Sequence, residues 1–283
     1  QAWLKASHPP RCTRSTTAMA QPRGHSPMHP INAEGGTWQQ DMSAEGDFAG
    51  CAVAEVPPDI RSGFIRKVYA ILSVQLAVTF AIAFYMNLNL TPRWVAENTL
   101  FFYMASFGTL GLTLGVSCCC ASAMRTFPTN YIFLGAITLG MATMVGFSTV
   151  MYTTDSVLLA LATTTAVFFV LTAYACLTKT DFTGMGPYLF AGLMALSMFG
   201  FMMMLWSFFT GAPLMGTTMH KVYACGGVLL FVLYIIYDTQ LIVGGTHKKH
   251  QFSVDDYAFA ALNLYLDIVN LFMFLLELTG ERR

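Results

Sequence analysis

Long apolar stretches, each of about 20 residues and separated by short polar loops, fill the chain from residue 68 onward. A helix of about 20 residues crosses the hydrocarbon core of a bilayer and satisfies its own backbone hydrogen bonds there. Only 11% of the residues are Asp, Glu, Lys or Arg, whereas soluble domains carry roughly 25%. We therefore predict an all-α integral membrane protein with a seven-transmembrane-helix bundle. The predicted spans are residues 68–88, 99–120, 130–151, 156–177, 187–209, 222–243 and 257–278.

The first 57 residues differ from the rest, because they are rich in Pro, Gly, Ser, His and charge and hold no apolar run. Such a segment cannot bury enough apolar surface to fold. We therefore predict a disordered N-terminal tail at 1–57 and a seven-helix membrane domain at 58–283. The tail lacks the apolar core of a cleavable signal peptide. We expect translation to start at Met19, with Met28 and Met42 as other candidates.

The basic residues outside the predicted spans favour one orientation, since cytosolic loops carry an excess of Lys and Arg. The counts favour a cytosolic N-terminus by seven to four. If the last span were re-entrant, the C-terminal arginines would also be cytosolic, and the sequence leaves this alternative open. The side of the N-terminus holds Arg61, Arg66, Lys67, Arg125, Lys179, Lys248 and Lys249; the other side holds Arg93, Lys221, Arg282 and Arg283.

Three acidic residues lie in the last two predicted spans: Asp238, Asp267 and Glu277. No Lys, Arg or His lies within any predicted span. A lone charge at the middle of the membrane costs roughly 2.5–3.5 kcal/mol. The two aspartates therefore need a proton, a metal cation or a basic side chain that reaches in from a loop. Glu277 lies at a helix end, where we expect it to face lipid headgroups.

The two aspartates are placed where they can meet. Counted from the cytosolic helix ends, Asp238 lies about 8 Å deep and Asp267 about 15 Å deep, on antiparallel neighbouring helices. Asn263, Asp267 and Asn270 recur at helical spacing, and Tyr234 lies one turn before Asp238, which predicts a polar cluster between the helices. Two carboxyls so close share a proton and titrate as a unit. The alternative is that both are protonated and serve only in packing.

Arg125 follows the second predicted span on the cytosolic side. Its long side chain can reach back toward a carboxylate, and we expect it to pair with Asp238 in a closed state. A second interpretation is that Arg125 only marks the cytosolic side, and the sequence fits both.

The C-terminal third resembles a known family. The sequence from Tyr237 to Gly245, and that from Asp256 to Asn270, is similar to the lifeguard branch of the Bax inhibitor family, the transmembrane Bax inhibitor motif proteins. The resemblance covers 61–280. Further segments that fit the same branch are Phe64–Tyr69, Cys118-Cys119, Pro128–Asn130 and Thr178–Thr183.

The resemblance implies a seven-helix fold, a role in restraining cell death, and a pH-sensitive calcium leak across internal membranes, which we expect to be endoplasmic reticulum or Golgi. It places Asp238 and Asp267 on the family's paired aspartates and Arg125 on a basic position that latches to one of them. Calcium is then a permeant ion and a transient ligand of the aspartates. No cofactor is expected.

Other classes of function were weighed against this one. An intramembrane aspartyl protease also uses two aspartates, one of them preceded by Tyr as Asp238 is, but its second motif is Gly-x-Gly-Asp and here it reads Leu264-Tyr-Leu-Asp267. We therefore do not expect an enzyme. A seven-helix receptor lacks support in the loops. A membrane protein that binds cell-death regulators without conducting remains an alternative. Expected partners are the lipid bilayer, calcium ions, protons and cell-death regulatory membrane proteins; with zero net charge, nucleic acid is not one.

Overall fold

The computed structural model describes residues 51–118, 124–211, 217–244 and 250–283. Within these ranges every long element is a helix, and seven helices are long and apolar enough to cross a membrane. The predicted all-α seven-helix membrane fold is therefore confirmed. The long helices are α2 (Pro58–Asn89), α4 (Thr99–Cys118), α5 (Thr129–Val150), α6 (Thr154–Leu177), α7 (Gly186–Thr210), α8 (Thr217–Val243) and α9 (Tyr257–Thr279), with the short α3 (Pro92–Glu97) and single turns η4 (Thr183–Met185) and η5 (Val254–Asp256) between them.

Local chemistry explains several helix ends. Pro58 and Pro92 occupy the first turns of α2 and α3, where a missing N–H costs nothing. The Thr153 side chain accepts a hydrogen bond from Ser156 N at 3.4 Å and caps α6. Gly211 ends α7 with φ of 67°, a left-handed conformation that glycine adopts without strain. These signals fix the starts of α2, α3 and α6 and the end of α7.

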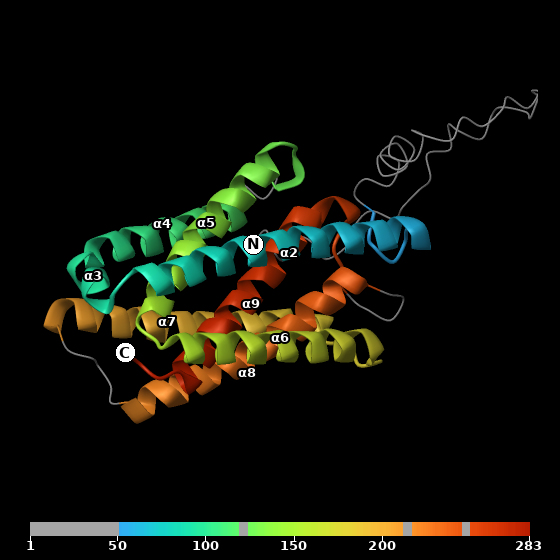
Figure 1. The fold of residues 1–283 in the computed structure, drawn as a ribbon. Coiled ribbons are helices and arrows are strands. Elements are labelled where there is room, and N and C mark those ends of the chain that lie inside the picture. The colour runs from blue at the N-terminus through green and yellow to red at the C-terminus, as the bar shows by residue number, and fades with distance from the viewer. Residues whose placement is uncertain (1–50, 119–123, 212–216, 245–249) are drawn as a thin grey trace, which may run out of the picture.

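Helix α9 forms the centre of the bundle. In Figure 1 it runs in red between α2 and α5 on one side and α6 and α8 on the other, and it contacts all four. Fully buried side chains such as Leu264, Tyr265 and Phe272 line it. Helix α7 is peripheral, with Gly186 and Leu189 as its buried residues among those described. The helix that carries Asp267 is thus the one most enclosed by protein.

Residues 51–57 correct the predicted boundary of the tail. Val53 is fully buried, its N–H donates to Phe252 O at 3.1 Å, and Val254 N donates to Cys51 O at the same distance. Ala54 N donates to Gln251 Oε1 at 2.9 Å. The segment is ordered because the chain before α9 supplies its hydrogen bonds, a partner about 200 residues away that local composition cannot reveal. The rest of the predicted tail, 1–50, lies outside the described residues.

The C-terminus lies at the opposite end of the bundle from residues 51–57. Thr153 N donates to Glu281 O and Arg283 N donates to Met151 O, both at 3.0 Å. These bonds tie the last residues to the turn between α5 and α6, while α9 begins beside residues 51–57. Helix α9 therefore runs from one end of the bundle to the other, as a spanning helix does. Lys248 and Lys249, which entered the orientation count, lie outside the described residues.

Candidate ion-gate site

Asp238 and Asp267 come together at the contact between α8 and α9. The two helices pack side by side, and the aspartates are 3% and 6% exposed. Their side chains are hydrogen-bonded to each other. The sequence predicted from helix depth that these two acids meet, and in the structure they do.

A hydrogen bond between two carboxyl groups needs a proton on at least one of them, because an ionised carboxylate only accepts. Asp267 Oδ2 is buried and has no hydrogen-bond partner among the described residues. In that same part of the chain, no basic side chain forms a salt bridge with Asp238 or Asp267. Contact between the two acids therefore requires a shared proton or a cation.

The predicted polar stripe is only partly gathered at this pair. Tyr234 lies close enough to interact electrostatically with both carboxyls. Asn270 Nδ2 instead donates to Leu266 O at 2.8 Å, within its own helix, and Asn263 is half-buried. Among the described residues no hydrogen bond joins Asn263 or Asn270 to either carboxyl. The site is two acids and one phenol.

Arg125 has a different partner from the one expected. Its Nε donates to Asp256 Oδ1 at 2.6 Å and its Nη2 donates to Asp256 Oδ2 at 3.1 Å. This bond raises the pKa of Arg125 above its ordinary value. The expected contact with Asp238 is corrected, because Asp256 lies in the turn that begins α9, whereas Asp238 lies about 8 Å further inside the bundle.

Two buried polar contacts on α2 were missed by the sequence analysis. Thr79 Oγ1 and Tyr265 Oη are 2.7 Å apart, and Gln75 Nε2 donates to Thr138 Oγ1 at 2.9 Å. They tie α2 to α9 and to α5. The signal that reveals them is polar residues four apart in the first span, since Gln75 and Thr79 share one helix face.

Glu277 does not simply face headgroups. Helix α8 begins at Thr217 instead of at residue 222, and it brings His220 Nδ1 to 3.5 Å from Glu277 Oε1. Both side chains are about one-third exposed or less, at 31% and 25%. The far end of α9 thus carries a second polar cluster, separate from the aspartate pair.

The capacity of the aspartate pair for metal is limited. No group of three or more His, Cys, Asp or Glu side chains able to hold a metal gathers within the described ranges. Two carboxyls offer four oxygens, whereas Ca²⁺ takes about 6–8 oxygen ligands. A cation at this pair must complete its shell with water or backbone oxygens.

Comparison with known proteins agrees with this architecture. The family model described as inhibitor of apoptosis-promoting Bax1 matches residues 61–283. Human protein lifeguard 3 is 35% identical over 227 residues, which cover 79% of this chain and 70% of that protein. Mouse protein lifeguard 4 is 38% identical over 237 residues, 83% of this chain and 92% of its own. The chain is therefore a multi-pass membrane protein that belongs to the Bax inhibitor family of cell-death regulators, in its lifeguard branch.

Proposed function

We propose that this protein is a pH-sensitive calcium leak channel of internal membranes, endoplasmic reticulum or Golgi, with a cytosolic N-terminus, and that it restrains cell death. The observation that carries the proposal is the hydrogen-bonded pair of buried carboxyls, Asp238 and Asp267. A buried acid pair without a basic partner among the described residues is expensive in a membrane. A functional role accounts for the presence of such a pair at the central helix contact.

The pair can act as a gate through its shared proton. With one proton, the hydrogen bond between the carboxyls ties α8 to α9. After that proton leaves, two negative charges meet at contact distance. Unit charges about 4 Å apart repel by about 4 kcal/mol even at an effective dielectric constant of 20. Such repulsion favours helix separation, or the arrival of a cation between the carboxylates.

Protons and calcium compete for the same oxygens in this scheme. Calcium flux should therefore be low at acidic pH, where the shared proton is retained, and should rise as the pH rises through the titration of the pair. Arg125 and Asp256 act on the same helix from its cytosolic end, because their salt bridge holds the start of α9. Opening then requires α9 to move against that bond.

The burial of the pair favours a gate over a protease. A peptide substrate needs access to both carboxyls, and these are 3% and 6% exposed. A proton or a partly dehydrated cation needs far less room.

Calcium flux into proteoliposomes across a pH series tests the proposal. The purified chain should pass calcium, and the flux should increase from acidic to neutral pH. Empty liposomes and liposomes with heat-denatured protein serve as controls. Vesicles that hold folded protein and pass no calcium at any pH would favour the non-conducting alternative, a protein that acts by binding cell-death regulators.

A further inference from the structure

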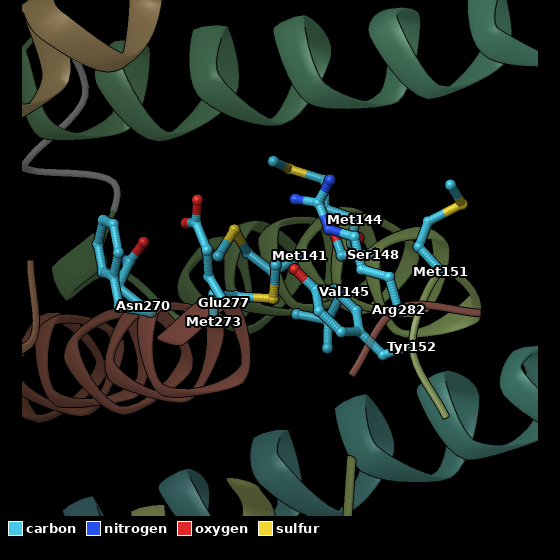
Figure 2. Close-up of a pocket in the computed structure, with 11 residues that line it drawn as sticks. Met141, Met144, Val145, Ser148, Met151, Tyr152, Asn270, Met273, Glu277 and Arg282 are labelled. Carbon is cyan, nitrogen blue, oxygen red and sulfur yellow. The ribbon is translucent and has the colours of Figure 1, made fainter. Parts of the chain in front are cut away.

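A cavity of about 440 Å³ lies between α5 and α9, in the half of the bundle far from residues 51–57. Figure 2 shows its lining, from Met141 and Met144 on α5 to Asn270 and Glu277 on α9. The volume falls within the range of about 300–1,000 Å³ that is typical of small-molecule sites. Neither Asp238 nor Asp267 lines it, so this cavity is separate from the aspartate pair.

Four of the eleven residues that line the cavity are methionines. Met141, Met144, Met151 and Met273 all line it. Unbranched thioether side chains adapt their shape and recur at surfaces that bind varied apolar partners. A lining of this kind accommodates a flexible hydrocarbon chain, and it offers few ligands to a hydrated ion.

One end of the cavity carries charges of both signs. In Figure 2 the side chains of Glu277 and Arg282 extend to the same side of the pocket. His220 Nδ1 lies 3.5 Å from Glu277 Oε1, and the Arg282 guanidinium lies 5.8 Å from the centre of the Tyr152 ring. Glu277 is in the last turn of α9, which is the level of lipid headgroups for a helix that spans the bilayer.

The last four residues supply Arg282 to this charged end. Gly280 to Arg283 form a strap, defined here as residues 280–283, that is tied to the first turn of α6. Glu281 N donates to Ser156 Oγ at 2.9 Å, and Arg283 Nη2 donates to Thr154 Oγ1 at 2.8 Å. A bridge between Tyr152 and Arg282 fixes the strap between them. The backbone at Arg282 is therefore fixed beside the pocket, and its side chain lines the pocket.

We propose that this pocket binds a zwitterionic phospholipid of the surrounding bilayer. One acyl chain lies among the methionines, the phosphate contacts Arg282, and the ammonium of the headgroup contacts Glu277. An anionic phospholipid has no positive charge to place opposite Glu277. A cationic amphiphile has no negative charge to place opposite Arg282. The pair of opposite charges at one end thus selects a headgroup that carries both.

Photocrosslinking of lipid tests this site. The full chain is placed in nanodiscs of phosphatidylcholine that contain a trace of phosphatidylcholine with a diazirine in its acyl chain, and crosslinked peptides are identified by mass spectrometry. The expected crosslinks concentrate on 141–152 and 270–282. Met144→Trp fills the cavity and should reduce them several-fold. Met202→Trp is the matched control, because Met202 is 59% exposed on α7, and it should leave them unchanged.

Competition on the unaltered protein keeps the test independent of how Met144→Trp folds. Unlabelled phosphatidylethanolamine should displace the probe from both segments more effectively than phosphatidylglycerol, and Glu277→Gln should narrow that difference. Crosslinks spread evenly over the outer helix faces would overturn the proposal. So would stronger displacement by phosphatidylglycerol, or crosslinking at these segments that Met144→Trp leaves unchanged.

Discussion

Arg125 and Asp256 form a two-point salt bridge that joins the turn before α5 to the start of α9. Asp256 Oδ2 also accepts from Ser253 N at 3.3 Å and so takes part in the capping turn of α9. The bridge therefore acts on the first turn of the helix that carries Asp267. It is a fixed point from which movement of α9 is restrained.

The first prediction concerns this bridge. Arg125→Gln should destabilise the protein by about 0.5–1 kcal/mol, since the arginine side chain is 58% exposed and solvent screens the pair. The same change should raise the basal calcium leak, because the start of α9 is freed. Because the bond raises the pKa of Arg125 further above its ordinary value, the arginine stays charged throughout the physiological range, and its contribution should be lost only in strong alkali.

Thermal unfolding in detergent and calcium flux measure these effects. Asp256→Asn should match Arg125→Gln, and the double variant should add little to either. Arg93→Gln is the control, since Arg93 and Glu97 form an exposed pair at 88% and 60%. If the effects of the Arg125 and Asp256 changes on the calcium leak are fully additive, the bridge does not act on the leak.

The second prediction concerns residues 51–57. Val53→Asp should destabilise the membrane domain by more than about 2 kcal/mol, because it places an unpaired carboxylate at a fully buried position. Tryptic cleavage after Arg61 should also become faster, since the segment that covers the start of α2 is displaced. Asp59→Asn, at an exposed position, should change neither the unfolding temperature nor the cleavage rate. If Val53→Asp changes neither the unfolding temperature nor the cleavage rate, this segment contributes nothing to stability.

What the sequence could predict follows from the range of each signal. The spans follow from apolar runs whose length is set by the bilayer, and the meeting of Asp238 with Asp267 follows from their depths on neighbouring antiparallel helices. The partner of Arg125 could not be derived in the same way, because it depends on how two turns are placed relative to each other. The order of residues 51–57 depends on hydrogen bonds to 251–254, which no local pattern contains.

The third prediction concerns the buried contact between α2 and α9. Tyr265→Phe should cost about 1–1.5 kcal/mol, because it removes the hydrogen bond between Tyr265 Oη and Thr79 Oγ1. The loss stays moderate since Thr79 Oγ1 also donates to Gln75 O at 2.8 Å. Tyr85→Phe is the control at a position 67% exposed. Equal unfolding temperatures for the two variants would contradict a stabilising role for the contact.

The fourth prediction concerns orientation. In a chain whose native cysteines are replaced, Lys179→Cys should react with a membrane-impermeant thiol reagent from the cytosol, and Arg93→Cys should react from the lumen. Both positions are exposed, and they lie in turns at opposite ends of the bundle. If Lys179→Cys is labelled from the lumenal side alone, the protein has the opposite orientation to the one that the charge distribution favours.

The most direct test of the gate is the pH profile of calcium flux in proteoliposomes that hold Asp238→Asn or Asp267→Asn. Each change keeps the size of the side chain and removes one titrating group, so each should flatten the rise of flux with pH. The double variant should differ little from either single one, since the two acids act as a unit. Asp155→Asn, at an exposed position on α6, should keep the wild-type profile. If both single variants also keep it, the pair does not gate the flux.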